Sequence, residues 1–163
     1  MKKAIPILII AAGLIILLYP KISAYYTGVK QLEVMRQWQY ESAELNDADK
    51  EESADKDKNI EGILIIEKIN LQLPIFYGFT SENMRYGAAM FAGSAKPGQS
   101  GNCAIAAHRN HAYGVMFNRL DEVQKGDIIK VKTTSREYTY KVFDKLYVKP
   151  DDTSVLSAGG NVK

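Results

Sequence analysis

The chain has 163 residues, of which 46% are hydrophobic and 25% are charged, and its formal net charge at pH 7 is +2. This length suits one folded domain with additional segments. The near balance of charge excludes the broad basic surface of a nucleic-acid-binding protein, and a single cysteine excludes an intramolecular disulfide framework.

The N-terminal segment is apolar from Ala4 to Tyr19 and is followed by Lys21. Sixteen helical residues span about 24 Å, which is shorter than a hydrocarbon core of about 30 Å unless lysines at both ends reach the interface. A cleaved signal peptide is the alternative, but no cut near Ala24 has small residues at both positions that a signal peptidase reads. We therefore expect residues 1–22 to form an uncleaved transmembrane anchor.

Residues 23–59 are expected to form a juxtamembrane helix and a charged linker. Apolar residues recur at near-helical spacing in the first half, at Val29, Leu32, Met35 and Trp38. We interpret Trp38 as a packing or interfacial residue. The stretch from Glu41 to Lys58 is dominated by Asp, Glu and Lys, so it cannot bury a core and reads as a solvated tether.

Residues 60–163 are expected to form the folded domain. Apolar runs and alternating patterns predict short strands at Ile63–Ile66, Leu71–Ile75, Met90–Phe91, Cys103–Ala107, Ile129–Val131, Tyr138–Val142 and Leu146–Val148. Helical turns are predicted at Ser81–Tyr86, Val115–Val123 and Ser154–Leu156. Pro74 cannot donate to a ladder, so it should lie at an edge or a bulge. Short strands with few helices indicate an all-β barrel or sandwich.

The stretch from Gly101 to Asp127 reads GNCAIAAHRNHAYGVMFNRLDEVQKGD. It opens with turn-forming residues, continues as an apolar run and reaches His108 where that run ends. A strand end that opens into a loop can present a reactive side chain on a rigid support. His108 is therefore the candidate catalytic residue, and a buried structural histidine is the simpler alternative when the residue is taken alone.

This stretch resembles the histidine segment of the sortases, the cysteine transpeptidases of Gram-positive cell surfaces. Their pattern is Gly-Asn, an apolar strand, Ala-Gly-His-Arg, a spacer, Phe-x-x-Leu and Gly-Asp. Ala107 departs from it, because the family usually has Gly there. The likeness extends from Gly62 to about Leu156, and class D sortases are the most similar. The matching residues are Gly101, Asn102, Ala106, His108, Arg109, Phe117, Leu120, Gly126 and Asp127.

The resemblance implies a sortase-type eight-stranded β-barrel in residues 60–163. We expect this barrel to be incomplete at its C-terminal end, because the strands that carry the family's cysteine and arginine have no counterpart in the sequence. The resemblance also implies a single-pass protein of the cell membrane whose C-terminal domain is extracellular.

The resemblance further implies a reaction and its partners. A thiolate attacks the Thr–Gly carbonyl of a Leu-Pro-x-Thr-Gly-like (LPXTG-like) sorting-signal peptide, and a histidine protonates the departing amine. An amine acceptor from the cell wall or a pilin then takes the acyl group, and no cofactor takes part. His108 matches the histidine. No residue matches the nucleophile, so we expect the chain to be inactive alone.

Other candidate residues have simpler interpretations. Cys103 precedes His108 by five residues in one predicted strand, which separates them by about 16 Å and places them on opposite faces. A nucleophile and its base need about 2.6–3.2 Å, so we interpret Cys103 as a buried core residue. His111 has no metal-ligating partner at a usable spacing, so it is a surface or substrate-rim residue rather than a metal ligand. Arg109 and Arg119 are expected to be solvated or ion-paired.

Two alternatives to a sortase with an interrupted active site stay open. One is a non-catalytic, membrane-tethered β module that binds a peptide or partner along an open sheet edge. The other is an enzyme that a second chain completes in trans.

Overall fold

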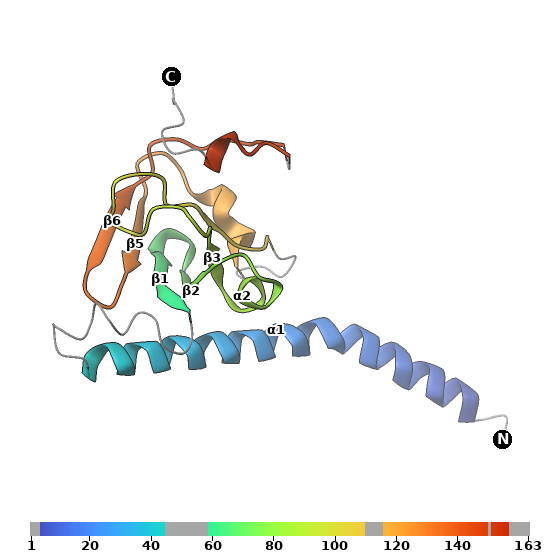
Figure 1. Ribbon diagram of the computed structural model, residues 1–163. Coiled ribbons are helices and arrows are strands. Elements are labelled where there is room, and N and C mark those ends of the chain that lie inside the picture. Colours follow the sequence, from blue (N-terminus) through green and yellow to red (C-terminus); the bar gives the residue numbers. More distant parts are fainter. Residues whose placement is uncertain (1–3, 45–58, 110–115, 150, 157–163) are drawn as a thin grey trace.

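The computed structural model describes residues 4–44, 59–109, 116–149 and 151–156. A long helix, α1 (Ala4–Glu44), lies beneath a small β domain (Figure 1). The domain contains α2 (Ser81–Tyr86) and three short 3-10 helices, η2 (Glu67–Ile69), η3 (Phe117–Glu122) and η4 (Ser154–Leu156). Its strands are β1 (Ile60–Ile66), β2 (Leu71–Tyr77), β3 (Ala88–Met90), β4 (Ile105–Ala106), β5 (Ile128–Lys132) and β6 (Glu137–Lys141).

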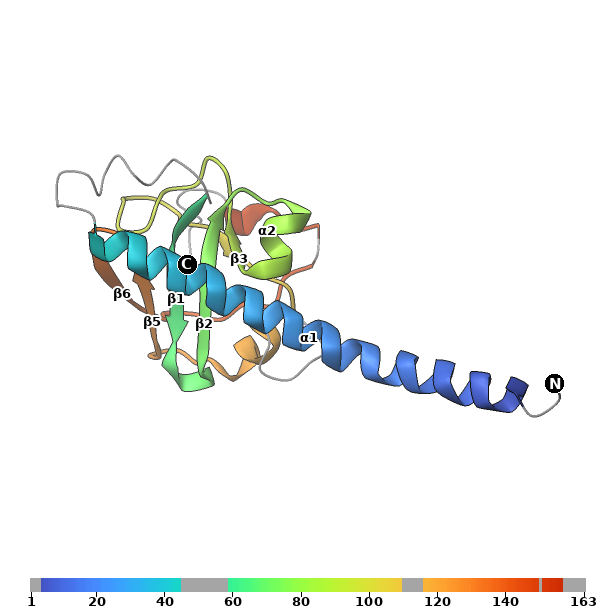
Figure 2. The same cartoon turned by 90° about the horizontal axis from the view of Figure 1, so that it is seen from below.

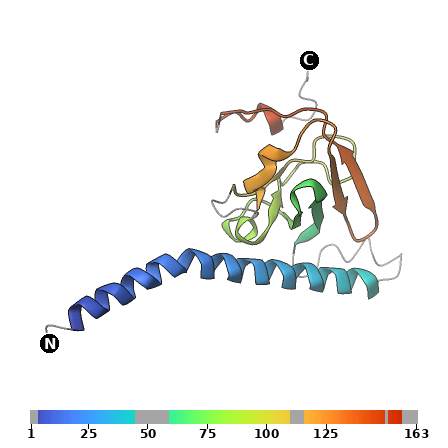
Figure 3. The same cartoon turned by 180° about the vertical axis from the view of Figure 1, so that it is seen from behind.

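The six strands form one sheet in the order β4-β3-β2-β1-β5-β6. The sheet is curled (Figure 3). The pair β2–β3 is parallel and the other pairs are antiparallel, so the sheet is mixed. The prediction of an eight-stranded, all-β barrel is wrong for the described residues, which give six strands in an open half-barrel and a 41-residue helix. Two predicted strands differ because their residues lack a neighbour to pair with. Residues 146–148 pair with no strand. The strand predicted at Cys103–Ala107 is shortened to the two residues of β4, because only Ala89 and Met90 of β3 pair with it.

Both faces of β1 and β2 are buried, which explains why β1 is apolar along nearly its whole length. Leu64 and Ile66 face the inner core of the curled sheet, together with Leu71, Leu73, Ile75, Ala88, Met90, Met116, Val123 and Val131. Ile60, Ile63 and Phe76 belong to a second cluster with Met35 and Trp38 of α1. The helix therefore acts as a second layer that covers the outer face of the sheet.

One stripe of α1 contacts the domain. Apart from the adjacent pair Val34 and Met35, its members recur every three or four residues, as a helix face requires. They are Ser23, Thr27, Gln31, Val34, Met35 and Trp38. Trp38 is only 5% exposed. The N-terminal half of α1 extends past the domain (Figure 2), and Pro20 lies inside the helix. Exposed apolar side chains cover this half, including Ile9, Ile10, Leu14, Ile15, Ile16 and Leu17.

The prediction of a transmembrane helix in residues 1–22 is wrong. Within the part of the chain that the structure describes, no helix has both the length and the apolar character needed to cross a membrane. The apolar run ends at Tyr19, where Pro20 and Lys21 follow, and its length of about 24 Å falls short of a hydrocarbon core of about 30 Å. The helix predicted from residue 23 onward is the continuation of α1. The charged linker, residues 45–58, lies outside the described residues.

Gly87 permits the close approach of β3 to β2. Pro74 lies in an inner strand rather than at an edge, one residue before the pairing with β3 begins at Ile75. A Cβ on Gly87 would collide with the Pro74 carbonyl oxygen and with the Pro74 and Phe76 side chains.

We expect Gly87→Ala to lower the free energy of unfolding by about 1–3 kcal/mol in urea denaturation, because the core must shift.

Gly28→Ala is the matched control for this substitution. Gly28 lies in α1, and a Cβ there meets nothing within 4 Å. We expect this change to be neutral or to stabilise by up to about 1 kcal/mol, because alanine favours a helix interior over glycine. Equal effects of the two substitutions would show that the contact at Gly87 is not tight.

Candidate functional site

His108 is exposed and lies two residues beyond the end of β4. Its backbone carbonyl oxygen accepts a hydrogen bond of 3.0 Å from the Phe117 amide, which ties this position to η3. Arg109 and Met116 are bridge partners, so the two ends of segment 110–115 are held together. The segment itself, with the predicted rim residue His111, lies outside the described residues. The fold thus presents the His108 side chain from a backbone that is fixed on both sides.

Met116 has an unusual backbone conformation next to His108. Its φ is +53°, a region that non-glycine residues rarely occupy. Its side chain is buried, and the Met116 Sδ accepts a contact of 3.4 Å from the Gln31 Nε2 of α1. Such strain persists where surrounding packing holds the residue in place, and it is concentrated at functional sites. Packing of Met116 therefore links the position of α1 to the backbone that carries His108.

Other residues of the histidine motif support this segment. Asp127 Oδ2 accepts hydrogen bonds from Lys68 Nζ and from the Gln124 amide, both at 2.7 Å. The lysine contact first, and then the amide, lower the pKa of Asp127. Gly126 has a φ of +99°, which suits glycine in this tight turn. Asn102 Nδ2 donates to the Val155 carbonyl oxygen at 2.9 Å. These motif residues are structural, because they anchor the turns around the histidine.

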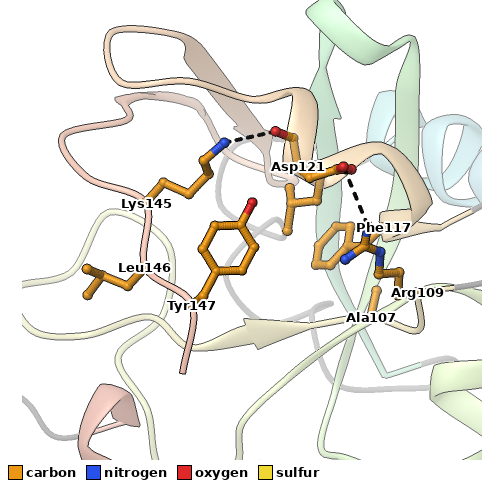
Figure 4. Close-up of a pocket in the computed structure, with 8 residues that line it drawn as sticks. Ala107, Arg109, Phe117, Asp121, Lys145, Leu146 and Tyr147 are labelled. Atoms are coloured by element: carbon orange, nitrogen blue, oxygen red, sulfur yellow. Dashed lines mark hydrogen bonds and ion pairs between the residues drawn. The ribbon is translucent and has the colours of Figure 1, made fainter. Parts of the chain in front are cut away.

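The first of two cavities beside Ala107–Arg109 is a hollow of about 240 Å³ that we call the η3 pocket (Figure 4). Apolar side chains form most of its wall, and the rest is a cluster of three charged residues, Arg109, Asp121 and Lys145. There, Arg109 Nη2 lies 3.5 Å from Asp121 Oδ2, and Lys145 Nζ donates to the Asp121 carbonyl oxygen at 2.9 Å. The lining residues are Ala107, Arg109, Phe117, Leu120, Asp121, Lys145, Leu146 and Tyr147.

The second cavity, which we call the α1 cleft, has a volume of about 460 Å³ and contains His108. It lies where α1 passes α2, so residues far apart in the sequence meet there. Arg109 borders both cavities. Among the described residues that line the cleft, none is acidic and three are basic. The lining residues are Ser23, Thr27, Ser81, Met84, Arg85, His108, Arg109 and Met116.

Cys103 faces the inner core instead of the α1 cleft. It lines a third cavity, the inner hollow of about 280 Å³, together with Leu64, Ile66 and Ile105. Its Sγ lies 3.8 Å from the Met90 Sδ. Burial, and secondarily the charge of Glu61, raise the pKa of the Cys103 thiol. A protonated, half-buried thiol on this side of the sheet is poorly placed to act as the nucleophile for His108.

The two arginines considered from the sequence are ion-paired, as expected. Arg119 pairs with Glu122 at 2.7 Å and donates to the Ile69 carbonyl oxygen at 3.1 Å. Sequence reasoning missed Arg85, Lys145 and Tyr147, as well as the α1 hydroxyls of Ser23 and Thr27. The helical spacing of Ser23 and Thr27 was available, but no local pattern indicated that this helix face reaches the histidine.

Comparison with known proteins agrees with this arrangement. Residues 64–161 match the Sortase domain family. The chain is 30% identical over 168 residues to sortase D of Bacillus subtilis (strain 168), and the alignment covers 96% of this chain and 83% of the relative. The solved structure of a Clostridium perfringens sortase D5 transpeptidase superposes with a TM-score of 0.71 at 26% identity, covering 80% of this chain and 82% of that one.

A further solved structure shows the fold alone. Sortase C of Streptococcus pneumoniae has a TM-score of 0.69 at 21% identity, and the superposition covers 77% of this chain and 81% of the other. The curled mixed sheet with a histidine just beyond the end of β4 is thus a sortase fold. The chain belongs to the sortase family of transpeptidases, and within that family it resembles class D.

Proposed function

We propose that this chain provides the histidine and the substrate cavities for sortase transpeptidation. The substrate is an LPXTG-like sorting-signal peptide, which is cleaved between Thr and Gly and joined to an amine of the cell wall or a pilin. The observation that carries this proposal is the position of His108, exposed between two residues that line the η3 pocket and itself lining the α1 cleft. The apolar wall of the η3 pocket suits the apolar residues of such a peptide.

His108 would move a proton in both halves of the reaction. When a thiolate adds to the Thr carbonyl, the C–N bond breaks and His108 gives a proton to the departing amine. The product is a thioester. When the acceptor amine attacks that thioester, His108 takes a proton from the amine, an amide forms and the thiolate leaves. The imidazole is therefore returned to its starting state after each cycle.

The thiolate in this scheme is not Cys103, the single cysteine of the sequence, because that thiol faces the inner core. The proposal assigns the nucleophile to a segment of the family type, supplied in the same polypeptide or by a second chain. The 163 residues alone are then inactive in transfer but competent to bind the sorting peptide.

Tyr147→Ala should weaken binding of a fluorescently labelled LPXTG peptide about five-fold or more, measured by fluorescence anisotropy, because aromatic side chains supply much of the contact in such pockets. Tyr147 is 78% exposed, so its loss should not disturb folding. Tyr25→Ala, which removes a 72% exposed tyrosine from α1, is the matched control and should leave the affinity unchanged. Equal binding of a scrambled peptide would contradict the assignment of this pocket.

The location is also part of the proposal. The amine acceptors lie at the cell surface, so the domain should act outside the cell. Association with the membrane rests on the exposed apolar side chains of the first half of α1 rather than on a membrane-crossing helix. Protease treatment of intact cells should remove the β domain. Full protection of the domain until the cells are lysed would refute an outside location.

A non-catalytic peptide-binding module is the second candidate function. The observation in its favour is the inner hollow, where Leu64, Ile66, Ile129 and Val131 line an open apolar cavity between the two ends of the sheet. An added strand could pair with an open edge and cover this cavity. Peptide binding that depends on Ile129 and is unaffected by Tyr147→Ala would favour the module.

A further inference from the structure

Arg85 is the one residue of α2 that brings a positive charge into the α1 cleft. Its guanidinium lies over the Tyr86 ring, 5.7 Å from the ring centroid, which stabilises it without neutralising it. Arg85 forms no ion pair with any residue in the described part of the chain. By contrast, Arg109, which also lines the cleft, shares its charge with Asp121. The cleft therefore holds an uncompensated guanidinium near His108.

Serine hydroxyls add further hydrogen-bond donors to the guanidinium of Arg85 in the α1 cleft. Ser23 of α1 and Ser81 of α2 both line the cleft. The Thr27 hydroxyl already donates to the Ser23 carbonyl oxygen at 3.0 Å, so it can only accept from a ligand. A guanidinium beside serine hydroxyls, with no acidic side chain in the described lining, is an environment for an anion.

We propose that the α1 cleft is a subsite for the amine acceptor, in which Arg85 binds a carboxylate of that acceptor. This inference rests on the proposed function, because transpeptidation requires a second substrate next to the histidine. The η3 pocket, lined by Ala107 and Arg109, is assigned to the sorting peptide, and the α1 cleft, lined by His108 and Arg109, remains for the acceptor. A carboxylate on Arg85 would hold the acceptor so that its amine can approach His108.

A carboxylate fits this subsite better than a phosphate. The paired N–H donors of a guanidinium bind either group, but one uncommitted guanidinium carries a single positive charge, which balances one carboxylate and not a doubly charged phosphate. Glu82 precedes Arg85 on the same short helix and is exposed, so it reduces the positive potential available to a doubly charged group.

The cleft also depends on α1, because Ser23 and Thr27 of this helix line it. The helix is held against the sheet by the cluster of Met35, Trp38, Ile60, Ile63 and Phe76, which we call the Trp38 cluster.

The test is a titration of the full 163-residue chain with the dipeptide Gly-Glu and, separately, with its diamide, monitored through the His108 ring signals in proton NMR. We expect the free acid to bind about ten-fold more tightly than the diamide, as one charge-assisted pair implies. Arg85→Gln should reduce that preference to about two-fold or less. Arg136→Gln removes another exposed arginine, from the β5–β6 hairpin, and should leave the preference intact.

Three results would overturn this subsite: equal binding of acid and diamide, an unchanged preference in Arg85→Gln, or tighter binding of inorganic phosphate than of the dipeptide. The sorting peptide is titrated into the same samples to separate the two proposals. Retained peptide binding without a preference for the free acid refutes the acceptor subsite alone. Loss of peptide binding in a folded chain refutes the proposed function instead. Circular dichroism of each variant confirms that the fold is kept.

Discussion

Replacing Trp38 by alanine should lower the free energy of unfolding by about 3–5 kcal/mol and release α1 from the domain. Trp38 is 5% exposed and packs with Met35, Ile60, Ile63 and Phe76, so its removal leaves a cavity between the helix and the sheet. The same change exposes the outer face of β1 and β2. Urea denaturation followed by circular dichroism measures the loss, since Trp38 is the single tryptophan and its fluorescence is absent from the variant.

Two further variants separate packing from other effects of Trp38→Ala. Trp38→Phe keeps an aromatic ring and removes the Nε1 proton donor, which is buried and has no partner in the described residues. It should therefore cost clearly less than the alanine variant. Leu32→Ala truncates a side chain that is 58% exposed on the same helix and should change stability by about 0.5 kcal/mol or less. A Trp38→Ala loss as small as that of Leu32→Ala would show that α1 is not held by this cluster.

The docking of α1 also links stability to the site. Ser23, Thr27 and Gln31 lie on the same helix stripe as Trp38 and reach the α1 cleft and Met116. Release of the helix would remove one wall of the cleft while leaving Arg85 and His108 on the domain. The Trp38→Ala variant should therefore lose affinity for an acceptor more than for the sorting peptide.

The sequence predicts most of the sheet because local patterns determine which residues a strand buries. The alternation of Leu71, Leu73 and Ile75 with Gln72 and Pro74 identifies β2 and its inner face, although Pro74 is buried as well. In β1 both faces are apolar, so the pattern shows burial but cannot show that one of the buried faces is covered by a helix. The predicted strand at residues 146–148 has a suitable local pattern and no partner strand, which no local pattern can reveal.

The candidate site likewise contains residues that the sequence identifies and residues that only the fold reveals. His108, Phe117 and Leu120 are found from the sequence because they belong to one continuous motif. Arg85 belongs to α2, and Lys145 and Tyr147 belong to the segment after β6, so they meet the motif residues only in the folded chain. The small polar residues of α1 are typical of many exposed helix faces. Their role depends on the docking angle of the helix, which is set by the Trp38 cluster.

The 163-residue chain alone should not cleave an LPXTG peptide above the rate measured without protein. Turnover by this route requires a thiolate next to His108. The Cys103 thiol is half-buried, lies against Met90 and has a raised pKa, so it stays protonated near neutral pH on the wrong side of the sheet. The measurement is a fluorogenic sorting peptide, with Cys103→Ala as the companion variant, and both proteins should give the same background rate.

Joining a sortase segment that carries the family's cysteine and arginine after Lys163 should create turnover. In that extended protein, His108→Ala should lower the rate by about 10²–10⁴-fold, the range typical of a general acid–base. Cys103→Ala should leave the rate unchanged, because its thiol only fills space beside Met90. Turnover by the 163-residue chain that disappears on Cys103→Ala would instead make Cys103 the nucleophile and would require β4 to rearrange. An extended protein that binds the sorting peptide but never cleaves it would show that the fold here is retained without the activity.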